Sequence, residues 1–169
     1  MKRQPYRHIL VPLDGSELAE AALPDAFRLA RLMGADVTLL QSIYLVDPRF
    51  GASPTYPIYL GHHLERERKV ANRYLNDVIG RFDTEDIEVR TVVSLGSAAD
   101  AILGYAYNNP VDVIMMSTHG RTGLDRWVYG SVTNKVLRNA NKPVLLVRSF
   151  SNNEKRYENA SQTASSYHF

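Results

Sequence analysis

The sequence of 169 residues contains no cysteine, which excludes disulfide scaffolds, thiolate catalysis and zinc or iron–sulfur sites built on cysteine. It also has no apolar run near the roughly 18 residues of a membrane-spanning helix, and its first residues lack the pattern of a signal peptide. Neither charge sign is in large excess, because 20 Lys and Arg against 18 Asp and Glu leave a net +2. We therefore expect a cytoplasmic protein whose partners include neither nucleic acid nor a membrane.

This length suits one domain with a substantial core and is short for two. We expect residues 1–150 to form that domain. Residues 151–169 contain almost no aliphatic side chains, so they cannot bury enough apolar surface to offset the entropy of ordering. They predict a flexible polar C-terminal tail.

Short apolar segments alternate with amphipathic ones along the chain. The apolar segments have the length and composition of buried strands and comprise residues 8–13, 36–43, 87–93, 111–116 and 143–147. The amphipathic segments predict helices over residues 16–34, 62–82, 98–108 and 131–140. Between the second strand and the helix beginning at His62, prolines and glycines predict a long loop over residues 44–61.

The first helix has recognisable ends and one interruption. Ser16 is the expected N-cap and Gly34 the expected C-terminal glycine. Leu18, Leu32 and the apolar residues between them at helical spacing predict one inward face. Pro24 lies inside the segment and predicts a kink or a division into two helices, because its ring removes a donor and crowds the preceding turn.

Strict alternation of strands and helices determines the expected fold class. Each strand must reach the next through a crossover helix, which produces a parallel sheet covered on both faces. We therefore predict an α/β protein with a doubly wound five-stranded parallel sheet. Ligands of such sheets bind beyond the carboxyl ends of the strands, where the strand order reverses.

The strongest candidate for chemistry follows the fourth strand. Here small residues lead to a helix that begins with Gly130-Ser131, so exposed N–H groups and the positive helix end can face a phosphate. Ser131 and Thr133 add hydroxyl groups, and Arg121 can approach a polyphosphate. The alternative is that the glycines only permit turns and Ser131 only caps the helix. Neither a Walker A loop nor a dinucleotide fingerprint is present.

Three motifs resemble the universal stress protein family. They are Ser117-x2-Gly120-x9-Gly130-Ser131, the opening Ile9-Leu-Val-Pro-Leu-Asp-Gly-Ser16 and the closing Asn141-Lys-Pro-Val-Leu-Leu-Val147. The likeness covers residues 6–148 and implies a nucleotide-binding, Rossmann-like fold of the adenine nucleotide alpha hydrolase type. Ser117 stands where ATP-binding members have the first glycine of the signature, so a side chain lies where backbone would approach the ligand. Because serine is the smallest polar replacement, we expect only modest crowding.

The resemblance implies ATP binding, with Mg held mainly by the phosphates. Carried over position by position, the nucleotide-binding residues are Pro12, Leu13, Asp14, Ser42, Met116, Ser117, Gly120, Gly130, Ser131, Val132 and Thr133, to which the charge of Arg121 adds a phosphate contact. Met116 and Val132 are alternatively plain core residues. Asp14 would accept a hydrogen bond beside the ribose, or alternatively serve as an ordinary turn carboxylate. Ser42 replaces a valine that is usual in the family, which weakens an apolar contact with adenine.

No catalytic constellation emerges from the sequence. The five histidines lack metal-ligand spacing with carboxylates, and no nucleophile elbow is present, so we expect neither an enzyme nor a protein metal site. The expected role is a regulatory stress-response module that binds ATP. Ser117 and Ser42 favour the alternative of a structural dimer that binds no nucleotide. A slow ATP hydrolase or adenylyl transferase is the second alternative.

The fifth strand, Pro143 to Val147, predicts a homodimer. It is the last strand in the chain, and four consecutive aliphatic residues on an open sheet edge are an aggregation hazard unless covered. The same strand of a second copy would close that edge symmetrically, and the family resemblance implies the same pairing. Alternatively, the tail or the 44–61 loop covers the edge and leaves a monomer. No motif identifies a further protein partner.

Overall fold

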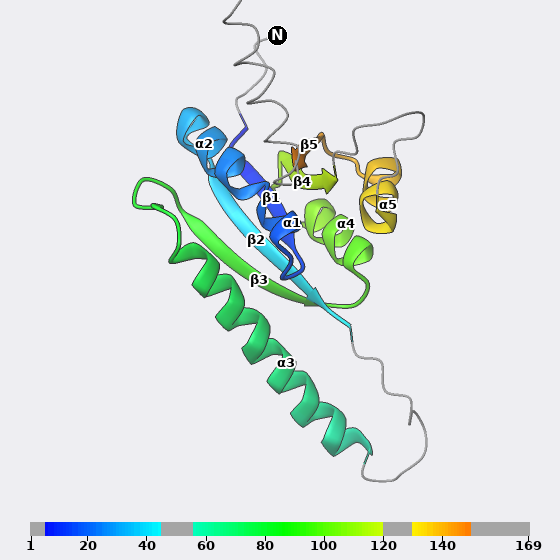
Figure 1. Ribbon diagram of the computed structural model, residues 1–169. Helices are drawn as coiled ribbons and strands as arrows, with labels where there is room; N and C mark the ends of the chain where they lie inside the picture. Colours follow the sequence, from blue (N-terminus) through cyan, green and yellow to red (C-terminus); the bar gives the residue numbers. More distant parts are fainter. Residues whose placement is uncertain (1–5, 45–55, 120–129, 150–169) are drawn as a thin grey trace, which may run out of the picture.

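The computed structural model describes residues 6–44, 56–119 and 130–149. In chain order the elements are β1 (His8–Leu13), α1 (Glu17–Glu20), α2 (Leu23–Met33), β2 (Asp36–Ile43), α3 (Tyr56–Ile79), β3 (Val89–Leu95), α4 (Ala98–Asn108), β4 (Val113–His119), α5 (Ser131–Asn139) and β5 (Val144–Ser149). The predicted fold class is confirmed, because the five strands form one parallel sheet in the order β3-β2-β1-β4-β5 (Figure 1). The predicted tail, residues 151–169, lies outside the described residues.

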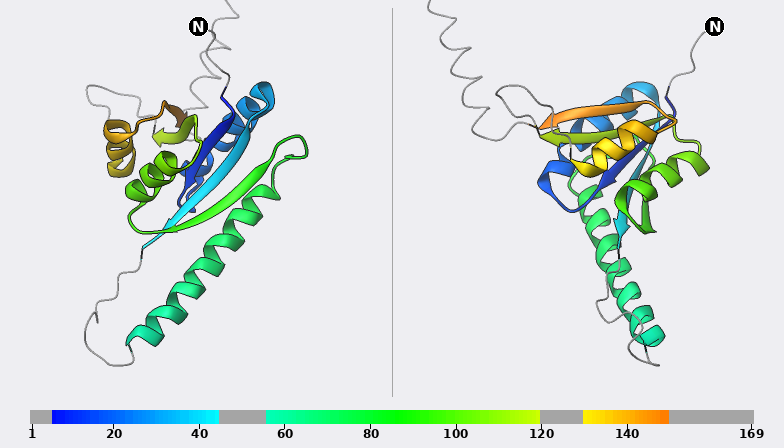
Figure 2. Two further views of the ribbon diagram at one scale, coloured as in Figure 1. Left: turned by 180° about the vertical axis from the view of Figure 1, so that it is seen from behind. Right: turned by 90° about the vertical axis from the view of Figure 1, so that its right-hand side faces the viewer.

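Helices cover both faces of this sheet, so the central strands β1, β2 and β4 are buried on two sides, whereas the edge strands β3 and β5 are partly buried (Figure 2). Along β1, Ile9 and Val11 point into a core shared with α2 and α3, whereas Leu10 points into a second core shared with α4 and α5. This alternation follows from the two-residue period of strand side chains. It explains why β1 is a nearly continuous apolar run rather than an alternation of apolar and polar residues.

The order of the strands places a switch point between β1 and β4. From β1 the chain moves outward through β2 to β3, then returns to the other side of β1 to form β4 and β5. Successive crossovers on the two sides of the switch point leave a crevice at the carboxyl ends of β1 and β4, because their connections diverge there. The fold therefore predicts a ligand site at the carboxyl ends of β1 and β4.

The first predicted helix is divided in two, as Pro24 indicated. Ser16 is the N-cap of α1, and Gly34 ends α2 with φ of 60°, a left-handed conformation that suits glycine. Pro24 lies in the first turn of α2, where its missing N–H has no helical acceptor to lose. The prediction that Leu32 faces inward is wrong, since Leu32 is 77% exposed. The break resets the helical phase, so spacing counted from α1 does not continue into α2.

The long helix α3 begins at Tyr56, six residues earlier than predicted, so part of the expected 44–61 loop is helical. Pro57 is compatible with this start because it lies in the first turn. Ala71, Leu75 and Val78 bury the C-terminal half against β2 and β3, while the N-terminal half runs beyond the sheet (Figures 1 and 2). In the part of the chain that the structure describes, α3 and the other helices are too short or too polar to cross a membrane.

The predicted strand bounds hold for β1 and β2 and shift for the other three strands. β3, β4 and β5 each begin one or two residues later than expected and continue two or three residues further. Pairing explains the extension, because Ile43 lies opposite Leu95 and His119 lies opposite Ser149. Main-chain hydrogen bonds to a neighbouring strand thus extend the sheet past the last aliphatic residue.

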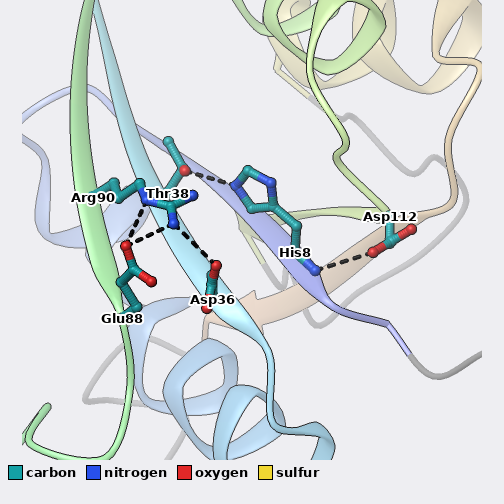
Figure 3. Close-up of polar contacts among 6 residues, drawn as sticks. All are labelled: His8, Asp36, Thr38, Glu88, Arg90 and Asp112. Carbon is teal, nitrogen blue, oxygen red and sulfur yellow. Dashed lines mark hydrogen bonds and ion pairs between the residues drawn. The ribbon is translucent and has the colours of Figure 1, made fainter.

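A buried polar contact ties the amino ends of the strands together, at the opposite edge from the switch-point crevice (Figure 3). His8 of β1 is 6% exposed and Thr38 of β2 is fully buried, and 2.7 Å separates His8 Nε2 from Thr38 Oγ1. The backbone N–H of His8 also donates to the Asp112 carboxylate just before β4. These contacts satisfy polar groups that would otherwise be stranded in the core.

Burial is the main reason that the pKa of His8 lies below its ordinary value of 6.5, because charging the ring there loses hydration. Arg90 of β3 lowers the pKa further by repulsion, against the opposite influence of Asp36 and Asp112. The Pro110 carbonyl, which can only accept, acts against this lowering because it favours a proton on the ring. We therefore assign the proton to Nδ1, which leaves Nε2 to accept from the Thr38 hydroxyl.

Candidate functional site

A cavity of ≈ 290 Å³ opens at the switch point, beyond the carboxyl ends of β1 and β4. Its described lining residues are Pro12, Leu13, Asp14, Ser16, Leu18, Ala19, Leu40, Ser42, Ala98, Ile102, Met116, Ser117, Thr118, Gly130, Ser131, Val132 and Thr133. The volume falls near the lower end of the roughly 300–1,000 Å³ typical of small-molecule sites. Strand ends and helix starts supply the walls, as the doubly wound topology requires.

Ten of the twelve predicted site residues line this cavity, although they come from four separate parts of the chain. They belong to the end of β1, the end of β2, the end of β4 and the start of α5. The remaining two, Gly120 and Arg121, lie outside the described residues. The fold thus brings together the predicted residues that can be located.

Asp14 begins the turn that connects β1 to α1. Its Oδ1 accepts from the Ser16 N–H at 2.9 Å and from the Ser16 hydroxyl at 2.6 Å, and Ser16 Oγ in turn accepts from the Ala19 N–H at 3.1 Å. Gly15 adopts φ of 87°, which a residue with a side chain rarely does. The turn-carboxylate alternative is therefore correct for Oδ1. Oδ2 has no hydrogen-bond partner among the described residues, so Asp14 can still accept from a ligand hydroxyl.

The start of α5 forms another wall, and Gly130 rather than Ser131 is its N-cap. Among the described residues no side chain caps this helix, so within that part of the chain the N–H groups of its first turn have neither a helical nor a side-chain acceptor. Ser131, Val132 and Thr133 line the cavity at this point. Unpaired N–H groups and the positive end of the helix dipole make this wall suitable for an anionic group such as phosphate.

Ser117 at the end of β4 lines the cavity, and its hydroxyl is directed to the protein backbone. It lies on the same face of β4 as Val113 and Met115, which pack into the core shared with α2. Its hydroxyl donates to the backbone carbonyl of Leu18 in α1. The side chain is therefore engaged by protein backbone, and the cavity beside it stays open.

The charges around the cavity are few. Among the described lining residues Asp14 is the only one with a titratable side chain. Lys135 of α5 is held by Asp100 of α4, with 2.6 Å between Nζ and Oδ1, and this lysine and the Ser97 hydroxyl hold the pKa of Asp100 below its usual value. In the ranges that the structure covers, no group of three potential metal-ligating side chains occurs. The geometry suits binding of a polar ligand with an apolar part and an anionic part.

Comparison with known proteins identifies the family. The sequence model of the universal stress protein family matches residues 5–148. The chain belongs to the universal stress protein family. Universal stress protein MJ0531 of Methanocaldococcus jannaschii is 32% identical over 145 residues, which cover 85% of this chain and 82% of the relative. Both the family and the fold implied by the sequence motifs are thereby confirmed.

Solved structures of universal stress proteins have the same fold. That of MJ0577, from the same organism, is 31% identical, covers 87% of this chain and 98% of that chain, and superposes with a TM-score of 0.64. The universal stress protein of Archaeoglobus fulgidus in complex with dAMP is 22% identical, covers 83% and 97% of the two chains, and superposes with a TM-score of 0.54. At 22% identity the second likeness shows the fold alone.

Several lining residues of this universal stress protein were missed in the sequence. They are Ser16, Leu18, Ala19, Leu40, Ala98, Ile102 and Thr118. Ala98 and Ile102 were recognisable in principle, because a helix that follows a parallel strand begins at the carboxyl edge of the sheet. Leu18 and Ala19 carried no such signal, since only the division of the first helix folds α1 over the crevice.

Proposed function

We propose that this universal stress protein binds ATP in the switch-point cavity and acts as a regulatory stress-response module rather than as a catalyst. One observation carries the proposal: a carboxylate oxygen and a helix start that have no side-chain partner among the described residues line the same cavity. These groups match the two polar ends of a nucleotide, since a ribose hydroxyl donates hydrogen bonds and phosphate oxygens accept them. The wall between them is largely apolar.

Each part of ATP has a matching set of lining residues. Leu40, Ile102 and Met116 provide apolar surface for the adenine. Asp14 accepts from a ribose hydroxyl, and the N–H groups at the start of α5, together with the Ser131 hydroxyl, donate to the phosphates. Mg²⁺ is held mainly by phosphate oxygens and water, which is how this ion is commonly bound with nucleotides.

The relative from Archaeoglobus fulgidus supports an adenine nucleotide as the ligand class, because its structure is a complex with dAMP. The triphosphate is the finer part of our proposal and rests on the α5 wall. The argument against binding drawn from Ser117 loses force, since its hydroxyl is engaged by the Leu18 carbonyl.

We propose that hydrolysis is negligible. An in-line attack needs a group that orients or activates water, and Asp14, the one titratable side chain of the described lining, accepts two hydrogen bonds at Oδ1 and is assigned to the ribose at Oδ2. A phosphate-release assay should give turnover far below the roughly 1 per second at the slow end of typical enzymes. Turnover in the enzymatic range would replace this proposal with the hydrolase alternative.

Calorimetry with Mg-ATP tests binding directly, with Mg-GTP as the matched control for the base and AMP for the phosphates. We expect heat with Mg-ATP, less with AMP, and little with Mg-GTP. A second measurement identifies any nucleotide released when the purified protein is denatured. No heat, no thermal shift at millimolar Mg-ATP and no released nucleotide would instead favour the dimer that binds no nucleotide.

We also propose that two copies pair through β5. This strand is at the end of the sheet and pairs with β4 on one side, and Leu145 is 39% exposed. A second copy of the strand satisfies the outer main-chain groups in a closed, self-limiting way. A cytoplasmic location, expected from the sequence, remains part of the same proposal.

A further inference from the structure

The four-residue helix α1 is a cavity wall with little apolar anchorage. Leu18 and Ala19 line the cavity and Ala19 also packs against the core shared with α2, yet none of the residues of α1 is buried. Isolated helices of this length are unstable in water, because one turn does not compensate the entropy of nucleation. The position of this wall must therefore depend on contacts that α1 makes with its surroundings.

One such contact comes from the sheet. The Ser117 hydroxyl of β4 donates to the Leu18 carbonyl, which also accepts from the Ala21 N–H. Serine supplies a donor that a glycine at this position lacks. This bond ties the middle of α1 to the end of the strand beside the cavity.

A second contact holds the end of α1 from outside the cavity. Glu20 Oε1 accepts from the Tyr74 hydroxyl at 3.0 Å, and Glu20 Oε2 lies 2.9 Å from Arg81 Nη2. The Glu20 side chain is only 17% exposed, so its carboxylate depends on these partners. Burial, followed by the bond to Glu20, raises the pKa of Tyr74, which keeps the hydroxyl protonated as a donor. Neither Tyr74 nor Arg81 lines the cavity.

We propose that Ser117, Tyr74 and Arg81 are positioning residues of the nucleotide site, which hold α1 in place as its wall through two polar latches. The inner latch is Ser117 with Leu18, and the outer latch is Glu20 with Tyr74 and Arg81. This inference rests on the proposed function. Its consequence is that residues outside the cavity control affinity, because only the fraction of molecules with α1 in place is competent to bind.

Amide hydrogen exchange of residues 17–21 measures the latches without any nucleotide. Tyr74→Phe combined with Arg81→Ala removes the outer latch and leaves the cavity lining untouched. Tyr105→Phe combined with Arg90→Ala is the matched control, because Tyr105 is also partly buried, Arg90 is also paired with carboxylates, and their elements, α4 and β3, are distinct from the partners of Glu20. We expect exchange about 3- to 10-fold faster in the latch variant, as for one or two lost hydrogen bonds, and no change in the control.

Affinity for Mg-ATP is the second readout. The outer-latch variant should bind about 3- to 10-fold more weakly, while the control binds like the parent. Ser117→Ala should act in the same direction and Ser117→Thr, which keeps the hydroxyl, should restore binding. If Ser117 acted only by contacting the ligand, and the position of α1 did not matter, the outer-latch variant would bind Mg-ATP as tightly as the parent. That result would overturn the proposal.

The two proposals fail in different ways. A parent protein that binds no adenine nucleotide contradicts the proposed function, while the exchange experiment still reports on the latches. Unchanged exchange in both the outer-latch variant and Ser117→Ala would show that α1 is held by other contacts and would refute the latches. Thermal unfolding of each variant confirms that the fold is retained, and Ser117→Ala provides a single-site variant if the double substitution destabilises the domain.

Discussion

The hydrogen bond between His8 and Thr38 joins β1 to β2 inside the core, and a Thr38→Val variant tests what it contributes. Valine keeps the branched shape and the volume of threonine but removes its hydroxyl. The acceptor at His8 Nε2, 2.7 Å from that hydroxyl, then has no donor in a site that excludes water. The perturbation therefore isolates one buried polar contact.

The expected magnitude follows from burial. Leaving a buried acceptor without a partner costs about 1–3 kcal/mol, and Thr38 is fully buried while His8 is 6% exposed. For a domain of this size, each kcal/mol lowers the melting temperature by roughly 2–4 °C. Thr38→Val should thus melt about 2–12 °C below the parent. The methyl group that valine buries in place of the hydroxyl offsets part of this loss, so we expect a decrease in the lower half of the range.

Denaturant unfolding at pH 7.5, followed by circular dichroism, measures the loss, with Thr91→Val as the matched control. Thr91 is a threonine of β3 in the same sheet, and its hydroxyl has no hydrogen-bond partner among the described residues. The control should remain within about 0.5 kcal/mol of the parent, because it removes no buried bond.

Equal stability of Thr38→Val and the parent would refute the reasoning, since it would mean that the His8 ring needs no donor at Nε2. A loss of the same size in Thr91→Val would also contradict it. That outcome would reflect a general response of the sheet to valine rather than the His8 contact.

Three further predictions concern pH, the ligand and assembly. Because the folded pKa of His8 lies below 6.5, the contribution of His8 to stability is complete above pH 6.5 and decreases as pH falls below that value. His8→Gln should flatten this part of the curve of stability against pH. An unchanged slope would exclude His8 as the source of the pH dependence. Gly130→Val should keep the fold, because an added Cβ meets no atom within 4 Å, yet should abolish Mg-ATP binding in calorimetry by filling the phosphate side of the cavity. Light scattering should give about twice the 19.1 kDa chain mass for the parent and a monomer for Leu146→Pro. Leu146 is chosen because the Pro143 carbonyl accepts from the Ile114 N–H, so alternate residues such as Leu146 direct their N–H to the outer edge of β5. A monomeric parent at high micromolar concentration would disprove the dimer.

Local sequence patterns were sufficient for the fold class and for most elements. β1 and β2 match their predicted bounds, and β1 ends at the turn that Asp14-Gly15 predicted. β4 is also a central strand, but its pairing with β5 carries it past its last aliphatic residue. α3 shows the limit of local patterns. Prolines suggested a loop, although Pro57 is acceptable in the first turn of a helix, and the packing of Leu75 and Val78 on the sheet helps to stabilise the helix as a whole.

The candidate site, too, could be predicted from the sequence only in part. Strand ends and helix starts could be assigned to one edge of the sheet from the order of elements, since parallel strands all point their carboxyl ends the same way. The role of Ser117 could not, because its partner Leu18 is 99 residues away in the chain. In the sequence Ser117 is a side chain in place of a glycine. Only the packing of α1 against β4 decided that its hydroxyl bonds a backbone carbonyl and leaves the cavity open.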